Sequence, residues 1–134
     1  MLDLRPQGTG AAPAPDATVL AEVDPDVPLA EQMLNAAREA GETMPEAIAD
    51  FAIDSFDADR LLDRVPRPMS RGEQQICALL ITLSRPFDQL WLIDPTAGLD
   101  GQRRRALAEL LVDLAEDHEI VVESDDPVFD RYRS

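Results

Sequence analysis

The segment LWLIDPTAGLD, residues 90–100, decides the fold class. Residues 89–93 form an apolar run of strand length, and the acid and proline that follow end the strand in a turn. Outward from this segment, the spacing of leucines and isoleucines predicts a helix from residue 70 to about 84, a helix over 103–116 and a strand over 119–123. Strands that alternate with helices of this length favour an α/β fold with a parallel sheet, in which ligand sites lie beyond the carboxyl ends of the strands.

The first half of the chain predicts a smaller helical part. It begins with a brief strand and a loop rich in glycine, proline and alanine, and a second strand is expected from Thr18. Two stretches with helical periodicity follow, and the predicted buried residues of the second are Ile48, Phe51, Ala52 and Phe56. We therefore expect three parts: 1–26 as an N-terminal strand and loop of the core, 27–68 as a helical subdomain, and 69–134 as the main part of the core.

The composition excludes several classes of function. The chain has 134 residues, enough for one domain with a sizeable core, and a net charge of -15, which repels nucleic acid. All 12 basic residues are arginine, so mechanisms that need a lysine ammonium are excluded. The single cysteine and single histidine can form neither a disulfide nor a Cys/His zinc site. No segment approaches the roughly 20 apolar residues that span a bilayer, so we expect a cytoplasmic protein without direct membrane insertion.

Three segments, in this order, resemble motifs of ABC-type ATPases, the nucleotide-binding domains of ABC transporters. They are MSRGEQQ (69–75) at the signature, RPFDQLWLIDPTAGLD (85–100) at Walker B and the D-loop, and IVVESDDP (120–127) at the switch histidine. The resemblance extends over about residues 27–130 and matches mainly the helical subdomain and the signature, Walker B, D-loop and switch half of that family. It implies a partial P-loop NTPase fold, truncated and degenerate, in a family whose two ATPase domains sandwich ATP head to tail.

The catalytic positions of Walker B are altered. The family ends this strand in Asp-Glu, whose aspartate holds magnesium and whose glutamate polarises the attacking water. The resemblance places Ile93 at the aspartate, and isoleucine cannot bind a hard cation that requires oxygen ligands. Asp94 falls at the glutamate with a side chain one methylene shorter, and we expect it to be an inactive base. A simple strand-ending turn at Asp94 and Pro95 explains the pair equally well.

The Walker A and switch positions are altered as well. RPQGTGAAP (5–13) can be aligned with G-x-x-G-x-G-K-S/T, which places Ala11 at the lysine and Ala12 at the hydroxyl. A tail rich in glycine, alanine and proline is an equally good explanation of this segment. At the switch histidine the chain has Asp125, whose carboxylate would repel a γ-phosphate. His118 precedes the strand and is predicted to be an exposed loop residue rather than a substitute.

The signature and D-loop keep more of the family pattern. The resemblance implies nucleotide contacts in trans from the signature-like residues Ser70, Arg71, Gly72 and Glu73 and from Asp100 of the D-loop. Arg71 replaces a glycine that allows close backbone approach to phosphate, so its side chain either contacts a phosphate or blocks it. Ser70 and Glu73 also match a capping box at the start of a helix, which would explain both residues without a nucleotide.

These alterations lead to one main hypothesis and two alternatives. The main hypothesis is a degenerate ABC-ATPase-like protein, without a metal site or cofactor of its own and without independent ATP hydrolysis. It would serve as a pseudo-subunit or regulatory partner of an ABC ATPase or permease, or pair with a second copy of itself. Any association with a membrane would be through such a transporter partner. ATP and magnesium would bind only in trans. The first alternative is an atypical ATP-binding subunit of an ABC transporter that uses Asp94 as base and Arg71 on the phosphate. The second is a nucleotide-independent interaction module, with the helical layer and Arg103–Arg105 as its docking face.

Overall fold

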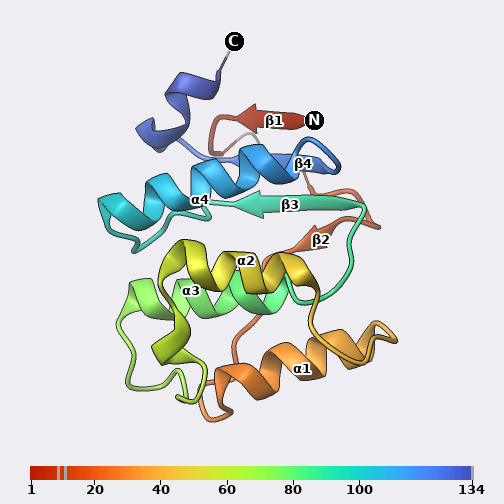
Figure 1. Ribbon diagram of the computed structural model, residues 1–134. Helices are drawn as coiled ribbons and strands as arrows, with labels where there is room; N and C mark the ends of the chain where they lie inside the picture. Colours follow the sequence, from red (N-terminus) through yellow and green to blue (C-terminus); the bar gives the residue numbers. More distant parts are fainter. Residues whose placement is uncertain (9, 11, 134) are drawn as a thin grey trace. The chain divides into compact units, whose positions relative to one another are not determined.

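The chain folds into two compact units, shown in Figure 1. The structure is a computed structural model that describes residues 1–8, 10 and 12–133. No helix within these described residues is long and apolar enough to cross a bilayer. The first unit combines the two ends of the chain, and the second is the segment between them: Met1–Leu20 with Phe87–Ser134, and Ala21–Pro86.

The first unit is built on a four-stranded parallel sheet. Its strands are β1 (Leu2–Arg5), β2 (Thr18–Val19), β3 (Gln89–Ile93) and β4 (Glu119–Glu123). Their order across the sheet is β1-β4-β3-β2, so β3 and β4 lie in the centre. The predicted α/β class with a parallel sheet is confirmed. β2 is only two residues long, shorter than the expected strand over 18–23, and two residues beyond it the Ala21 backbone N–H donates to the Thr82 hydroxyl at 2.9 Å instead of to a neighbouring strand.

The strand register gives the sheet two different faces. Aligned residues form two rows across the sheet: Leu4, Val122 and Leu92 in one, and Arg5, Glu123 and Ile93 in the next. Because side chains alternate between the two faces of a sheet, the first row belongs to an apolar face. The second row belongs to a face that carries charged side chains at the carboxyl edge of the strands. This edge is where a ligand site is expected in a parallel sheet.

Two helices complete the first unit, α4 (Gly101–Leu114) and the 3-10 helix η2 (Pro127–Tyr132). Figure 1 shows α4 running alongside β3 and β4. The buried residues of α4 form one stripe along the helix: Leu107, Ala108, Leu110 and Leu111. η2 follows β4 and was not predicted, because a six-residue 3-10 helix is too short to show a helical period. It nevertheless contributes Phe129, which is fully buried.

The second unit is a small helical layer, as predicted. Its elements are α1 (Leu29–Glu39), α2 (Ala47–Phe56), the 3-10 helix η1 (Asp59–Leu61) and α3 (Arg71–Thr82). The buried residues of α2 are Ala49, Ala52, Ile53 and Phe56, which follow a single helical stripe. Phe51 is 54% exposed, so the prediction that it is buried is wrong. The error arose because Phe51 lies on the opposite side of the helix from the stripe that small alanines form.

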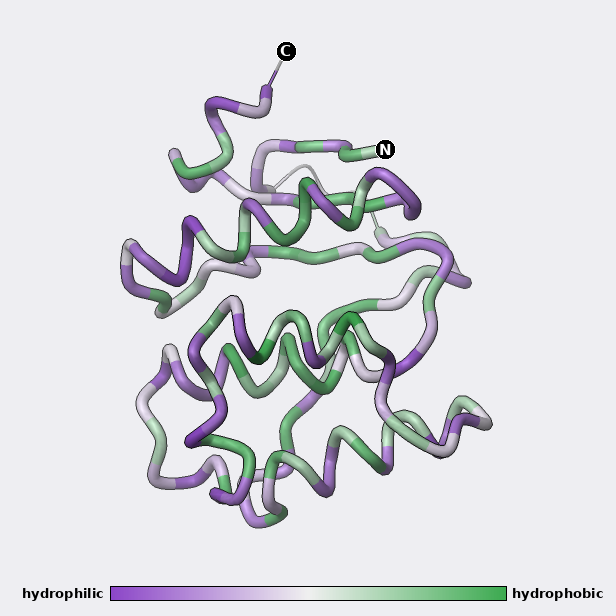
Figure 2. Tube along the Cα trace, viewed as in Figure 1, coloured by the Kyte–Doolittle hydropathy of each residue, from purple (hydrophilic) through white to green (hydrophobic). Residues whose placement is uncertain are grey.

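α3 is the central helix of the second unit and packs against α1 and α2. All its residues from Ile76 to Thr82 are buried, and Figure 2 shows hydrophobic residues along this helix. The units therefore divide differently from the predicted ranges 27–68 and 69–134. α3 belongs with the helical layer because its buried sides are covered by α1 and α2.

Cys77 lies in the buried part of α3 and is expected to be chemically inert in the folded protein. Its Sγ atom is 3.4 Å from Met69 Sδ. Burial, together with the charge of Glu73, raises the pKa of the Cys77 thiol to about 11, so the reactive thiolate is scarce at neutral pH. We expect iodoacetamide at pH 8 to leave Cys77 unmodified in the native protein and to alkylate it fully in urea, as measured by mass spectrometry. Rapid alkylation without urea would contradict this placement.

Candidate functional site

The carboxyl end of β3 forms a tight turn at Asp94. Ile93 is the last strand residue and is 46% exposed. Asp94 follows with φ of 49°, in the left-handed region that aspartate tolerates better than most residues. Its backbone N–H donates to the Glu123 carbonyl at 2.8 Å, and its carbonyl accepts from the Ala97 N–H at 3.2 Å. The predicted strand-ending turn is therefore present, and it holds the end of β3 against the end of β4.

The D-loop segment that follows is held by hydrogen bonds within the first unit. The buried Thr96 donates its hydroxyl hydrogen to Asp126 Oδ2 at 2.8 Å. Asp100 caps α4, because its Oδ1 accepts from the Arg103 backbone N–H at 2.8 Å and its Oδ2 lies 3.6 Å from the Arg103 guanidinium. The Asp100 side chain is still 61% exposed. It can therefore be reached by a partner while it stabilises the helix start.

The signature-like residues form the predicted capping box at the start of α3, within the second unit. Ser70 Oγ accepts from the Glu73 backbone N–H at 3.1 Å, and Glu73 Oε1 accepts from the Ser70 N–H at 3.2 Å. Glu73 Oε2 also accepts from Arg60 at 2.9 Å. The Ser70 backbone N–H and then Arg60 hold the pKa of Glu73 below its ordinary value, against the opposing effect of burial. This contribution to stability is present above the pKa of an unfolded glutamate and is lost as the pH falls through the lower folded pKa. Arg71 is exposed beside the cap and Gly72 is half-buried.

Removal of the cap is expected to weaken the second unit. Ser70→Ala leaves the Glu73 N–H without its acceptor and should lower the free energy of unfolding by about 1 kcal/mol, whereas Ser70→Asn, which can also cap, should cost less. Urea unfolding followed by circular dichroism measures both. The matched control is Ser55→Ala, since the Ser55 hydroxyl donates only to the Phe51 carbonyl within α2. An equal loss in Ser70→Ala and Ser55→Ala would show that the box contributes nothing specific.

The loop after β1, where the sequence suggests a Walker A remnant, is occupied by two carboxylates. The Gly8 backbone N–H donates to Glu123 Oε1 at 3.0 Å, and the Gln7 N–H donates to Asp125 Oδ1 at 3.0 Å. Gly8 and Gly10 have φ of 82° and 75°, conformations that favour glycine and that turn backbone amides toward one side of a loop. The Gln7 and Gly8 amides therefore have anion partners, and these come from the last residue of β4 and from the segment just after it.

Glu123 is the residue of this site that the sequence did not reveal. It is only 5% exposed, and its Oε2 atom is buried without a hydrogen-bond partner among the described residues. The available signal was an acid that directly follows the apolar run of β4, in register with Arg5 and Ile93. A buried acid at a strand end is unusual because burial of an unpaired charge is costly. Its neighbours explain its position, because it accepts from Gly8 on the adjacent loop.

The described residues after Gly10 lack the helix that follows the glycines of a P-loop. Ala12 is exposed, and Ala11 lies outside the described residues. None of the described residues between β1 and β2 is helical, whereas a P-loop gains part of its phosphate affinity from the helix that follows it. Pro13 and Pro15 account for this, because a proline within a helix removes a backbone donor and clashes with the preceding turn.

His118 lies in the loop before β4, as predicted, but it is half-buried rather than exposed. Its ring lies 4.7 Å from the Phe87 ring, and Nδ1 lies 3.1 Å from the Leu114 carbonyl. It stands immediately before β4, whereas Asp125 comes after the end of that strand. His118 therefore serves as a packing residue at the opposite end of β4 from the switch position. Among the described residues, no cluster of three or more His, Cys, Asp or Glu could hold a metal ion.

Solved structures provide the comparison for this arrangement. No family model matches the chain, and no curated protein matches it. The dimeric form of a bacterial ABC transporter cassette superposes with a TM-score of 0.70 at 18% identity, over 87% of this chain and 55% of the cassette. The chain has the fold of an ABC-type ATPase cassette. An ATP-binding subunit of an ABC transporter gives a TM-score of 0.66 at 22% identity, over 87% and 52%, and RNase-L inhibitor gives 0.64 at 22%, over 87% and 24%.

The chain spans about half the length of the cassettes that it matches. These structures are less than 25% identical to the chain, so the comparison shows the shared fold alone. The residues that the sequence resemblance assigns to the signature, Walker B and switch positions lie at the start of α3, after β3 and after β4: Ser70, Asp94 and Asp125.

Proposed function

We propose that this chain is a degenerate ABC-ATPase-like protein without independent ATP hydrolysis. The observation that supports this most is the pair of carboxylates on the loop after β1, where Glu123 accepts from Gly8 and Asp125 from Gln7. Backbone amides in such a loop would otherwise attract the phosphates of a nucleotide. Two carboxylates at this loop repel phosphates and compete for the same donors, in a chain whose net charge is already -15.

The other nucleotide positions support the same proposal. Ile93 offers no oxygen ligand to magnesium at the end of β3. The chain has no lysine that could contact a phosphate in the first place. Asp94 alone would then have to act as a base without the metal and phosphate clamp that make phosphoryl transfer efficient. Together these changes remove positioning and charge stabilisation, the two effects on which phosphoryl transfer depends.

The first test is ATP turnover by the purified chain. With magnesium present, we expect phosphate release to remain at the background measured without protein, because no described group can position the metal and the γ-phosphate together. Asp94→Ala should leave this background unchanged, as should Asp88→Ala, an exposed aspartate before β3. Turnover that disappears in Asp94→Ala and persists in Asp88→Ala would contradict the proposal and favour an atypical ATPase.

The second part of the proposal is that the chain acts on a competent ABC ATPase or permease at the cytoplasmic side of a transporter. One solved cassette of the same fold is a dimer, and such an arrangement would suit either a partner ATPase or a second copy of this chain. Ser70, Arg71 and Asp100 are exposed, which contact with a partner requires. In this role the signature-like residues and Asp100 contact ATP bound to the partner rather than to this chain.

The trans contact can be separated from the helix caps. The partner is identified by crosslinking and co-purification from the native cell, and its ATP hydrolysis is then measured with and without this chain. Ser70→Asn with Asp100→Asn keeps cap-forming side chains at both helix starts and removes the hydroxyl and the charge. We expect this double variant to lose the effect of the chain on the partner's rate. Ser55→Asn with Asp88→Asn is the matched control, and an unchanged effect in the first double variant would refute the trans contact.

A nucleotide-independent interaction module is the second candidate function. Two large apolar residues of the second unit are exposed, Met44 by 71% and Phe51 by 54%. Exposed apolar side chains of this size occur at protein contact sites. A complex that is lost in Phe51→Ser and retained in Ser70→Asn with Asp100→Asn would favour this module over the pseudo-subunit.

A further inference from the structure

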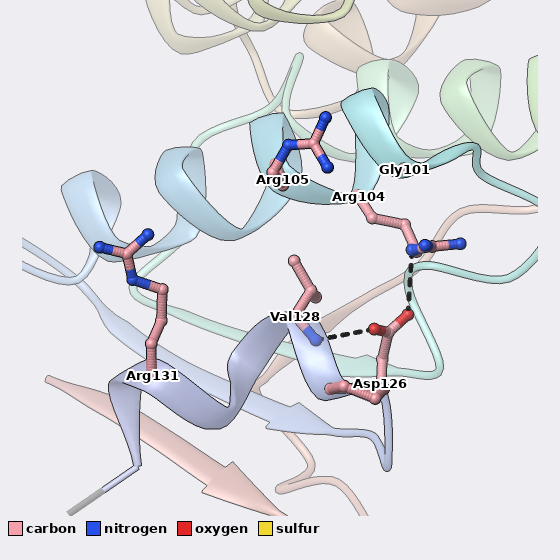
Figure 3. Close-up of a pocket in the computed structure, with 7 residues that line it drawn as sticks. Gly101, Arg104, Arg105, Asp126, Val128 and Arg131 are labelled. Atoms are coloured by element: carbon pink, nitrogen blue, oxygen red, sulfur yellow. Dashed lines mark hydrogen bonds and ion pairs between the residues drawn. The ribbon is translucent and has the colours of Figure 1, made fainter.

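A positively charged hollow lies between the start of α4 and η2, within the first unit (Figure 3). Its volume is about 560 Å³, which falls within the roughly 300–1,000 Å³ of typical small-molecule sites. It is lined by Gly101, Arg104, Arg105, Asp126, Val128 and Arg131. Figure 3 shows Arg105 on α4 and Arg131 on η2, with the Val128 side chain directed toward α4. The hollow thus combines three arginines with the apolar side chain of Val128, in a protein whose net charge is negative.

The one acid in the hollow is fully engaged. Asp126 Oδ1 accepts from the Val128 backbone N–H at 2.9 Å, and Oδ2 accepts from the Thr96 hydroxyl at 2.8 Å. Arg104 Nε lies 3.7 Å from the same Oδ2 and also compensates its charge. Arg104 donates in addition to the Leu99 carbonyl at 3.2 Å. The negative charge of Asp126 is therefore used within the protein.

Two arginines are left with uncompensated charge. Neither Arg105 nor Arg131 forms an ion pair within the described part of the chain, and the Arg131 guanidinium carbon lies 5.4 Å from the centre of the Tyr132 ring. Two acids that are close to them in the sequence have partners already. Asp100 pairs with Arg103 at 3.6 Å, and Asp130 with Arg133 at 3.4 Å. The hollow therefore keeps a net positive charge.

The position of Arg105 at the start of α4 strengthens this charge. A Cβ atom added to Gly101 would lie 3.4 Å from Arg105 Nη1, so the guanidinium rests against the first turn of the helix. The start of a helix carries partial positive charge, and a cation there is unfavourable by about 0.3–1 kcal/mol. A bound anion would reverse this unfavourable term. The same site would offer it two guanidinium groups that can donate paired hydrogen bonds.

We propose that this hollow binds the phosphate group of a small ligand through Arg105 and Arg131. A phosphate dianion matches the two uncompensated charges and the planar donor geometry of guanidinium better than a neutral ligand does. The hollow has room for more than inorganic phosphate, so the rest of a phosphorylated molecule can lie over Val128. This site belongs to the first unit alone, and it is separate from the loop after β1 and from the proposed action on a partner ATPase.

Calorimetric titration without magnesium tests the site, with inorganic phosphate and AMP as the two probes. We expect saturable binding by the wild-type chain and at least tenfold weaker binding by Arg105→Gln with Arg131→Gln. The matched control is Arg38→Gln with Arg64→Gln, two exposed arginines of the second unit whose replacement makes the same charge change, and it should alter affinity less than twofold. Circular dichroism confirms that each variant is folded.

The probes also identify the source of the phosphate. Equal affinity for both probes indicates free phosphate, and tighter binding of AMP indicates a phosphorylated organic molecule; either result supports the site. The site is refuted if neither probe binds, if Arg38→Gln with Arg64→Gln weakens binding as much as Arg105→Gln with Arg131→Gln does, or if binding persists in the latter variant. ATP turnover plays no part in these readouts, so their failure would leave the proposed function untouched.

Discussion

Val122→Asp is expected to unfold the first unit. Val122 is fully buried in β4, and the register places it between Leu4 of β1 and Leu92 of β3. A carboxylate at this position would lose its hydration without a partner, a cost of at least about 4 kcal/mol. Small domains have only about 5–15 kcal/mol of stability in total, so most of it would be lost. Trp91 on β3 is the only tryptophan, and its fluorescence during urea unfolding reports on this unit.

The matched control is Val19→Asp, the same substitution on β2 at the edge of the same sheet. Val19 is 49% exposed, so its carboxylate can remain hydrated, and we expect a loss below about 1 kcal/mol. Similar urea midpoints for Val122→Asp and Val19→Asp would show that Val122 does not lie in the centre of the sheet.

Phe129→Ala is expected to lower the free energy of unfolding of the first unit by about 3–5 kcal/mol. Phe129 is fully buried although η2 is a short 3-10 helix, so its ring must hold η2 to the rest of the unit. Removal of the ring leaves a cavity beneath η2, which also contributes Val128 and Arg131 to the positively charged hollow. The urea midpoint by Trp91 fluorescence measures the loss of stability.

Phe51→Ala is the control for this prediction, because it makes the same change at a phenylalanine that is 54% exposed. We expect the free energy of unfolding of Phe51→Ala to change by no more than about 0.5 kcal/mol. Circular dichroism measures this unfolding, because Phe51 lies on α2. If Phe129→Ala were as mild as Phe51→Ala, η2 would contribute little to the folded unit.

Helices and strands could be predicted wherever the apolar residues follow a clear period. The strand at residues 89–93 and the helix after Ser70 are present as expected, because the apolar run and the capping box are local signals. The prediction for Phe51 failed because alanines can form the buried stripe of a helix, and size alone does not show which side is covered. η2 was missed because a single 3-10 segment has no period to detect.

The site could be predicted only in part, because contacts between residues far apart in the chain leave no local signal in the sequence. Asp94 directly follows β3 and Asp125 lies two residues beyond β4, so the sequence could place both at the edge where a parallel sheet presents its ligands. Glu123 was missed because its role depends on Gly8, a residue 115 positions away in the chain. The positively charged hollow was missed because Arg104 and Asp126, which pair there, belong to two separate elements of the chain. This pairing leaves the charges of Arg105 and Arg131 without a partner acid among the described residues.

By itself, the sequence determined the alternation of strands and helices and the cap at Ser70, since both depend on residue type and local spacing. Only the tertiary structure decided which backbone amides and arginines each carboxylate contacts. Parallel pairing of β1 with β4 brings Glu123 and Asp125 to the amides of the β1 loop, and the packing of η2 beside α4 engages Asp126. Charge compensation is a property of distances in space, and those distances exist only once the chain has folded.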